Sequence, residues 1–289
     1  MGYVRTRLGR LFYEERGAQR RSGDPAIVLL HGLLFDGGMW RGQVEPLAAL
    51  GRVVILDGPG HGKSEPAPRF MLEEHADALL DAFGELGIRR AVVVGLSWGG
   101  MVAMRLALQH PGKVAGLALL DTSADVEPLA QRVKFRAFIA MHRRIGFPFS
   151  LFQRELAPLM FGPRARVESP ELPDAAYRRM MSFDRAGLSR AAIAVVVHRK
   201  KILADLPRIH TPTLVICGRE DRSTPPEQSE AIARGIPRAR LEIIEGAGHM
   251  SALEDPAAVN AHLVPFVRGC VEDAGRADVS DRHGDDAAT

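Results

Sequence analysis

Short, almost continuously apolar runs alternate along the chain with longer segments whose apolar positions recur at helical spacing. The runs expected to form buried strands are Ala26–Leu30, Val53–Leu56, Ala91–Val94, Val114–Leu120, Thr213–Cys217 and Leu241–Ile244, and helical patterns lie near residues 38–50, 70–86, 98–110, 226–235 and 256–268. Strands that are apolar throughout are typical of a mostly parallel sheet covered on both faces. The start of the chain differs, because β-like stretches in Tyr3–Glu14, broken at Gly9, predict an antiparallel hairpin.

The alternation stops between Thr122 and about Leu206, where the pattern predicts four helices and no strand. The first begins near Asp125 and Pro128 and ends at Gly146, the second is capped by Ser150 and ends at Gly162, the third opens at Pro173-Asp174, and the fourth is capped by Ser189 and covers Ala191–Val197. Such an insertion indicates a cap over the active face of the sheet. We therefore expect a core of residues 1–121 and 207–270, a helical cap at 122–206, and a polar tail at 271–289 without ordered structure.

Composition and charge narrow the class of protein. Of the 289 residues, 46% are hydrophobic and 25% charged, as in an ordinary globular protein. Residues 126–205 hold 15 Lys and Arg against 7 Asp and Glu, a net charge of +8, but no nucleic-acid motif accompanies them, so we expect a solvated surface and no nucleic-acid partner. Two cysteines, no membrane-spanning run and no secretion core predict a cytoplasmic protein with free thiols and no membrane partner. Monomer and homodimer both stay open.

Residues 95–100 read Gly-Leu-Ser-Trp-Gly-Gly and directly follow an apolar strand. A serine on a tight turn between a buried strand and a helix is how a hydrolase exposes an alcohol nucleophile. Gly95 and Gly99 flank Ser97 two residues to either side, where the strained turn would bring larger side chains into collision. The pattern is short, so its value depends on suitable partners further along the chain.

A serine hydroxyl needs a base to activate it, and the base needs an acid to orient it. Asp221 and His249 each lie in a loop just after a predicted strand, in the order Ser, Asp, His that this arrangement requires. We therefore predict Ser97, Asp221 and His249 as the catalytic triad. Asp121, which also ends a strand, and Glu220 are the competing acids.

Acyl transfer also needs preorganised N–H donors for the oxyanion of the transition state. We expect these to be the backbone amides of Trp98, at the start of a helix, and of Leu33, in the loop after the first parallel strand. His31 and His61 are expected to order loops by hydrogen bonding. The side chains predicted to line an apolar pocket are Leu34, Met101, Phe138 and Met250. The alternative is that these side chains only belong to the hydrophobic core, and for Met101 this interpretation is favoured.

Four motifs carry a resemblance to a known superfamily. They are His31–Leu34, Asp57–Ser64, Gly95–Gly100 and Gly246–His249. Together they resemble the α/β-hydrolase superfamily over about residues 5–121 and 207–268. The resemblance implies a mostly parallel eight-stranded sheet flanked by helices, with an inserted helical cap.

Within that superfamily the chain is most similar to the branch of enol-lactonases, aryl esterases and cofactor-free haloperoxidase-like enzymes. Leu96–Met101, Asp36–Trp40 and Pro212–Gly218 carry this similarity. Trp98 stands where the branch more often has methionine, which reshapes the expected pocket. The serine at position 97 separates the chain from dehalogenases and epoxide hydrolases that attack with aspartate.

The sequence thus favours a serine hydrolase that needs no metal or cofactor and cleaves a carboxylic ester, lactone or thioester of a small to medium apolar substrate through an acyl-enzyme on Ser97. One alternative keeps the fold and triad for C–C bond hydrolysis, acyl transfer or a biosynthetic tailoring step. A second alternative is a ligand-binding sensor. The cap sets specificity and offers no readable motif, so the natural substrate is not predicted.

Overall fold

The computed structural model, which describes residues 1–19, 21 and 23–285, is built on one eight-stranded sheet with the order β1-β2-β4-β3-β5-β6-β7-β8. Its strands are β1 (Gly2–Thr6), β2 (Gly9–Arg16), β3 (Ala26–Leu30), β4 (Val53–Leu56), β5 (Ala91–Leu96), β6 (Val114–Leu120), β7 (Thr213–Gly218) and β8 (Ala239–Ile244). β1 and β2 form an antiparallel hairpin that pairs antiparallel with β4, and all the other pairs are parallel. The predicted α/β-hydrolase fold is confirmed.

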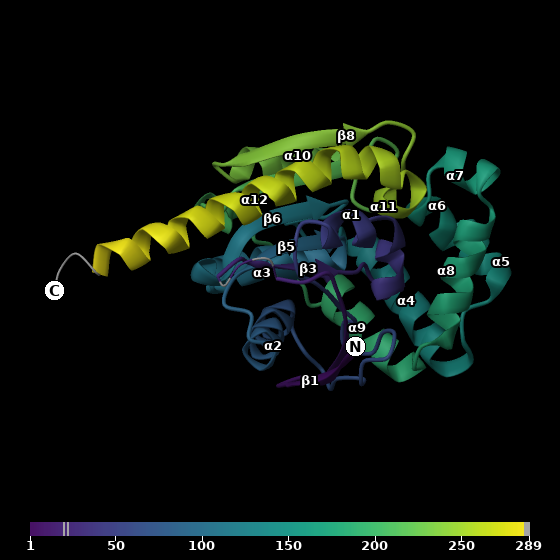
Figure 1. Ribbon diagram of the computed structural model, residues 1–289. Helices are drawn as coiled ribbons and strands as arrows, with labels where there is room; N and C mark the ends of the chain where they lie inside the picture. The colour runs from purple at the N-terminus through teal and green to yellow at the C-terminus, as the bar shows by residue number, and fades with distance from the viewer. Residues whose placement is uncertain (20, 22, 286–289) are drawn as a thin grey trace.

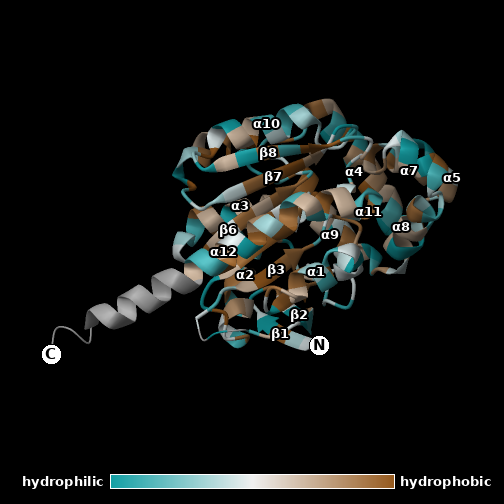
Figure 2. Cartoon of the chain, turned by 45° about the horizontal axis from the view of Figure 1, so that its top comes forward, coloured by the Kyte–Doolittle hydropathy of each residue, from teal (hydrophilic) through white to brown (hydrophobic). Residues whose placement is uncertain are grey.

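Helices cover both faces of the sheet (Figure 1). α2 (Leu72–Glu85), α3 (Trp98–Gln109) and α10 (Pro226–Gly235) pack on one face, while α1 (Val44–Ala48), α11 (Ser251–Glu254) and α12 (Pro256–Asp285) pack on the other. Alternate residues of a strand serve the two faces, so Val28 belongs to the first apolar cluster and Ile27 to the second. Figure 2 shows the central strands in hydrophobic colours. Their runs are apolar without interruption because helices cover both faces of the sheet.

The segment after β6 is helical, and Figure 1 shows most of it gathered at one end of the sheet. Its elements are α4 (Leu129–Ile145), α5 (Phe149–Leu151), the π-helical turn η3 (Phe152–Leu156), α6 (Ala157–Met160), α7 (Pro163–Glu168), α8 (Glu171–Ser182) and α9 (Arg185–Val196). Gly146 ends α4 as predicted, and Gly162 follows the second helical stretch. The chain then returns to the core through η4 (Leu203–Arg208), which leads into β7.

Three predicted helix starts in this segment are wrong. The second helical stretch begins at Phe149 after the cap residue Pro148, so Ser150 lies inside it. α8 begins at Glu171, two residues before Pro173, because proline is compatible with the first turn of a helix. α9 begins at Arg185 and is capped by Asp184, whose side chain accepts a hydrogen bond from the Gly187 amide, so Ser189 lies inside the helix. The short helix α7 was not predicted.

The end of the chain also differs from expectation. Helix α12 continues past residue 271, and Val271 and Ala274 are buried in the apolar cluster on its face of the sheet. The prediction of a tail without ordered structure from residue 271 is therefore wrong at these positions, because apolar residues continue the buried stripe of the helix. Residues 286–289 lie outside the described residues. Among the helices of residues 1–19, 21 and 23–285, none is long and apolar enough to cross a membrane.

Candidate active site

Ser97 occupies a strained turn between β5 and α3. Its backbone has φ 51° and ψ −112°, in the positive-φ region that residues other than glycine rarely adopt. A Cβ added to Gly95 would lie 2.4 Å from the backbone carbonyl carbon of residue 99, so the turn closes only because position 95 is glycine. The Ser97 amide donates to the Leu120 carbonyl at 2.9 Å, which ties the turn to the end of β6. This is the geometry of a nucleophile elbow.

His249 and Asp221 are brought together from the loops after β8 and β7. His249 Nδ1 lies 2.8 Å from Asp221 Oδ2, and both side chains are buried. The amides of Ser223 and Thr224 donate to Asp221 Oδ1 at 2.8 and 2.9 Å, and the Thr224 hydroxyl donates to Oδ2 at 2.8 Å. These donors orient the carboxylate, with Oδ2 facing His249 Nδ1. It therefore accepts the Nδ1 proton of His249 and leaves Nε2 as the nitrogen free to act as a base.

The charges around His249 favour its protonated form. Burial alone would lower the pKa of His249, but the charge and hydrogen bond of Asp221 outweigh it, and the charges of Asp121 and Glu254 act in the same direction. The pKa of His249 is therefore raised above its ordinary value. An imidazole in this setting can hold the proton that it takes from a nucleophile.

Asp121 lies beside this pair but has other partners. Its Oδ1 accepts from the Gly218 amide at 2.8 Å, and its Oδ2 accepts from the hydroxyl of Ser251. Burial and the charge of Asp221 raise the pKa of Asp121 well above its ordinary value. Asp221 is therefore the acid that contacts the histidine. Glu220, the other competitor, has Oε2 beside Gly162 of the cap, and among the described residues it has no hydrogen bond to His249.

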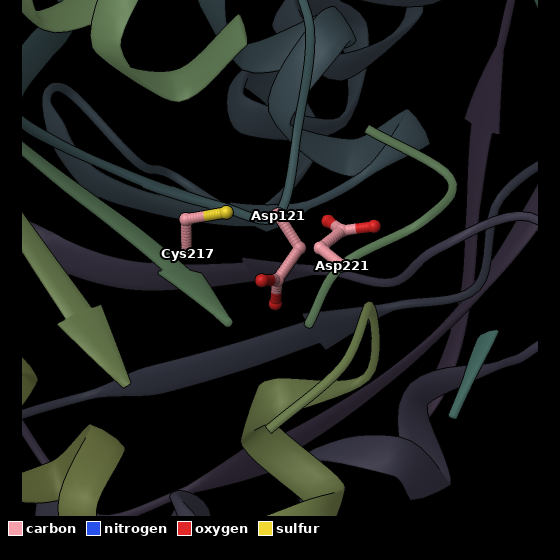
Figure 3. A group of neighbouring side chains, drawn as sticks. All are labelled: Asp121, Cys217 and Asp221. Atoms are coloured by element: carbon pink, nitrogen blue, oxygen red, sulfur yellow. The ribbon is translucent and has the colours of Figure 1, made fainter. Parts of the chain in front are cut away.

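The side chains of Asp121, Cys217 and Asp221 cluster at neighbouring strand ends, and Figure 3 shows the two carboxylates pointing in different directions. One possible ligand atom from each lies within 4.8 Å of the others. Each carboxylate oxygen already accepts a protein hydrogen bond, and the Cys217 thiol donates to the Gly218 carbonyl. Burial also raises the pKa of the Cys217 thiol, which opposes the thiolate that a metal requires. The cluster therefore fits a hydrogen-bonded brace better than a metal site.

Two backbone amides are free to bind an oxyanion near Ser97. Trp98 is the first residue of α3, so its amide has no acceptor within the helix, and Leu33 lies in the loop after β3. In the described part of the chain neither amide donates a hydrogen bond to another protein group. Leu34 has φ 73°, and its own amide donates to His61 Nε2 at 3.3 Å, which fixes the loop that presents Leu33. Among the described residues, the two predicted donors are thus left without a protein acceptor.

His31 and His61 order loops, as predicted. His31 Nε2 accepts from the Gly58 amide at 2.7 Å, and the ring contacts the Gly32 carbonyl through Nδ1. Burial lowers the pKa of both imidazoles, so the rings stay neutral and can accept through Nε2.

The indole of Trp98 packs against these two rings and does not line the pocket. The expectation that it reshapes the pocket directly is therefore wrong. A Cβ on Gly58 would lie 2.6 Å from the indole, so the side chain fills the space beneath the histidine loops.

An apolar cavity of about 150 Å³ lies between the sheet edge and the cap, with Ser97 and His249 in its wall. Leu34, Met101 and Phe138 line it as predicted, and Met101 is thus both buried and part of the pocket. The cap also contributes Phe135, Ile139, Phe147, Met160 and Met180. Met250 is not among the lining residues. That prediction is wrong because the Met250 side chain turns into the apolar cluster beneath the sheet.

Several site residues carry no sequence signal. Thr224 binds Asp221, and Glu254 accepts from the amides of Gly248 and Met250, the two neighbours of His249, at 3.0 and 3.1 Å. Arg199 and Glu127 lie in the pocket wall although they come from the cap segment, where charged side chains were expected to be solvated. Only the contacts of the folded chain reveal these roles.

Comparison with known proteins places the chain among hydrolases. The α/β hydrolase fold family matches residues 25–256. A putative carbamate hydrolase, RutD, from Pseudomonas syringae is 29% identical, and the match covers 89% of this chain and 98% of that protein. The polyketide synthase ThaQ of Burkholderia thailandensis is 31% identical over 84% of this chain, which spans only 12% of that protein's length.

Two solved structures agree closely with this fold. A thermophilic esterase from Thermogutta terrifontis has a TM-score of 0.83 and 29% identity, with 93% of this chain and 98% of that chain covered. The enol-lactonase of Burkholderia xenovorans LB400 has a TM-score of 0.83 and 27% identity, with coverage of 92% and 99%. With the family match and the strained serine turn, these relationships establish that the chain belongs to the α/β hydrolase family of enzymes.

Proposed function

We propose that the protein is a serine hydrolase that cleaves a carboxylic ester, lactone or thioester through an acyl-enzyme on Ser97. The observation that carries the proposal is the meeting of three features at one cavity. They are the serine in a strained turn, the histidine paired at 2.8 Å with a buried aspartate, and the free amides of Leu33 and Trp98. Nucleophile, base and oxyanion donors are the parts that acyl transfer needs.

In the proposed reaction, His249 Nε2 takes the Ser97 hydroxyl proton while Oγ attacks the substrate carbonyl carbon. The Leu33 and Trp98 amides donate to the resulting oxyanion, and Asp221 stabilises the imidazolium. The tetrahedral intermediate then breaks its bond to the leaving group, which receives the proton from His249. The same nitrogen then takes a proton from water as the water oxygen attacks the acyl-enzyme. The bond from the acyl carbon to Oγ breaks, His249 returns the proton to Ser97, and the acid is released.

The lining of the cavity supports a small, mostly apolar substrate. Its walls are chiefly leucine, methionine and phenylalanine, and a cavity of about 150 Å³ suits a group of roughly benzene size. The names of the similar esterase and enol-lactonase agree with an ester or lactone. The thioester stays within the proposal because the same attack cleaves it.

The proposal is tested by labelling the purified protein with a fluorophosphonate probe and measuring turnover of p-nitrophenyl esters of graded acyl length. Ser97→Ala should abolish both labelling and turnover. Ser189→Ala is the matched control, because Ser189 also lines the cavity and its hydroxyl has no hydrogen-bond partner among the described residues. Labelling that persists in Ser97→Ala would overturn the assignment of the nucleophile. Transfer of the acyl group to an added alcohol in preference to water would favour acyl transfer.

A further inference from the structure

Thr224 holds both oxygens of the Asp221 carboxylate. It lies three residues after Asp221 in the loop that follows β7, it is 2% exposed, and it forms part of the cavity wall. Its amide donates to Oδ1 at 2.9 Å, and its hydroxyl donates to Oδ2 at 2.8 Å. Oδ2 is also the oxygen that faces His249 Nδ1, at 2.8 Å. The Thr224 hydroxyl therefore binds the atom through which Asp221 acts on the histidine.

The four contacts of this carboxylate fill its acceptor positions. Each carboxylate oxygen has about two lone-pair sites, and Oδ1 accepts from the amides of Ser223 and Thr224 at 2.8 and 2.9 Å. Oδ2 accepts from the Thr224 hydroxyl and from His249. The hydroxyl oxygen also lies 3.3 Å from His249 Nδ1, so it contacts both members of the pair. Besides the histidine itself, the hydroxyl is thus the contact that holds Oδ2.

The orientation of the carboxylate depends on these contacts because the side chain alone does not fix it. The torsion that turns an aspartate carboxylate about its Cβ–Cγ bond has a broad energy profile, so neighbouring donors set its angle. The two amides hold only Oδ1. Without the hydroxyl, Oδ2 is free to turn away from His249 Nδ1. The position of Nε2, on which the proposed attack by Ser97 depends, would then change.

The Thr224 hydroxyl is not itself placed to react. Its one proton is used in the bond to Oδ2, and its oxygen lies against Nδ1 of the ring, whereas the proposed base is Nε2. Ser223 is the neighbouring hydroxyl residue in the cavity wall, and it contacts the carboxylate through its amide. In the part of the chain that the structure describes, the Ser223 hydroxyl binds neither Asp221 nor His249. The two adjacent residues therefore contrast a hydroxyl that supports the pair with one that does not.

We propose that Thr224 is a positioning residue, whose hydroxyl keeps Oδ2 of Asp221 against Nδ1 of His249 during acyl transfer. This inference rests on the proposed function, since it gives Thr224 a part in that reaction. Thr224 acts through the pair and not by contact with the substrate. The interaction that it supports is the one with the imidazolium, which forms in the transition state and not in the bound ground state. Its loss should therefore lower kcat and leave KM almost unchanged.

The first test compares Thr224→Val with Thr224→Ser in steady-state kinetics on p-nitrophenyl esters. Valine has nearly the shape of threonine but places a methyl group where the hydroxyl lay, and a methyl group cannot donate to Oδ2. Thr224→Val should lower kcat by about 10- to 100-fold and change KM by less than about twofold. Thr224→Ser keeps the hydroxyl and should retain kcat to within about threefold. A Thr224→Val enzyme with wild-type kcat, or an equal loss in Thr224→Ser, would overturn the inference.

The pH dependence of kcat/KM separates positioning from general damage to the loop. Burial opposes the protonation of His249, but the charges of Asp221, Asp121 and Glu254 together outweigh it and raise the pKa of the ring. If Thr224→Val lets Oδ2 turn away, only the Asp221 contribution weakens, and the midpoint should move to lower pH by about half to one unit, the equivalent of one hydrogen bond.

The direction of this shift is the decisive result. A carboxylate that loses one donor but stays in place becomes more basic, which would move the midpoint to higher pH. A shift to lower pH therefore shows that the carboxylate has turned from the histidine. An unchanged midpoint, or one that rises, would contradict a positioning role. Thr224→Ser should keep the wild-type midpoint.

Ser223→Ala is the matched control, because it removes the adjacent hydroxyl and keeps the amide that binds Oδ1. It should change kcat by less than about twofold and leave the midpoint in place. A loss as large as that in Thr224→Val would rule out a specific role for the Thr224 hydroxyl. If Thr224→Val does not fold, Thr224→Ala, which leaves space in place of the hydroxyl, should show the same shift to lower pH.

A measurement without substrate keeps this inference separate from the proposed function. The His249 ring can be titrated by NMR, with its signals assigned by their loss in His249→Gln, and Thr224→Val should lower the midpoint there too. If the wild type cleaves no ester and is not labelled at Ser97, the proposed function itself fails. If the wild type and Thr224→Val cleave esters equally well, only this inference fails.

Discussion

Gly99 packs so closely against Leu30 that a Cβ at position 99 would lie 2.2 Å from the Leu30 carbonyl oxygen. This contact sets how near the first turn of α3 comes to the end of β3, and therefore how near Ser97 lies to the loop that carries Leu33. Gly99→Ala should lower kcat/KM for esters by at least about 100-fold, since a shift of about 1 Å is enough to misalign the nucleophile and the oxyanion donors. Steady-state kinetics on p-nitrophenyl esters measure the effect.

The same substitution should cost about 1–3 kcal/mol of unfolding free energy, because the neighbour is backbone and cannot turn aside. Gly84→Ala is the matched control. Gly84 is exposed near the end of α2, with nothing within 4 Å of an added Cβ, so the change should stabilise the protein by about 0.5–1 kcal/mol. Urea denaturation of both variants gives the comparison. A Gly99→Ala enzyme with wild-type activity would contradict the packing argument.

Asp221→Asn should reduce turnover far more than Asp121→Asn. Asp221 contacts His249, so its amide replacement should lower kcat by about 10⁴-fold, as expected when the imidazole loses its orienting carboxylate. Asp121 binds Gly218 and Ser251 instead of the histidine, so its amide replacement should change kcat by less than about tenfold. Kinetics on the two purified variants decide between the acids. A larger loss in Asp121→Asn would reverse the assignment.

Much of the core and of the candidate site could be predicted from the sequence because both depend on local patterns. Strands buried on both faces are apolar without interruption, so the ends of β3, β4 and β6 agree with the predicted runs. Parallel strands bring their carboxyl ends to one edge, so the loops after β5, β7 and β8 were expected to meet there. The partners Ser97, Asp221 and His249 followed from that edge and from their order along the chain.

The rest depended on contacts between distant segments. Met250 follows His249, but the turn of the loop directs its side chain into the core. The indole of Trp98 is held under the histidine loops, which no spacing in the sequence indicates. The ion pair of Arg199 with Glu127 joins residues 72 positions apart, and burial changes the meaning of charges that otherwise read as a solvated surface.

The pH dependence of kcat/KM should report the raised pKa of His249. Neutral imidazole is the active form, so activity should fall as the pH drops through that pKa, with a midpoint above the ordinary value of about 6.5. Asp221→Asn should move this midpoint to lower pH, because it removes the largest cause that raises the pKa. The rates are measured from about pH 5 to about pH 9. A wild-type midpoint well below 6.5 would contradict the raised pKa of His249.

The raised pKa of His249 also affects the stability of the fold, but in the opposite direction from activity: it stabilises the folded state at low pH, where activity falls. Because the folded pKa of His249 lies above its unfolded value, protonation favours the folded state. This contribution is fully present below the unfolded pKa and is lost as the pH rises through the folded pKa. His249→Gln should therefore lose more unfolding free energy relative to the wild type at acidic pH than at neutral pH, measured in urea. An identical pH dependence in the variant and the wild type would contradict the raised pKa.

Glu254 should prove essential to the position of His249 although it does not touch the histidine through a hydrogen bond. Its carboxylate accepts from the amides of Gly248 and Met250 on either side of His249 and from Gly162 of the cap at 2.9 Å. Glu254→Gln replaces one accepting oxygen with a donor that faces these amides. It should cost about 1–3 kcal/mol of stability and lower kcat about 10- to 100-fold.

Asp255→Asn is the matched control for this prediction. Asp255 is the next residue and also binds the cap, through Arg164 at 3.1 Å, but this pair is partly exposed and should contribute no more than about 1 kcal/mol. Asparagine can also keep the hydrogen bond that Asp255 accepts from the Ala258 amide at the start of α12. Thermal unfolding and kcat should thus change little in Asp255→Asn and strongly in Glu254→Gln. Equal effects of the two changes would mean that the cap contact, and not the support of the histidine loop, is what matters.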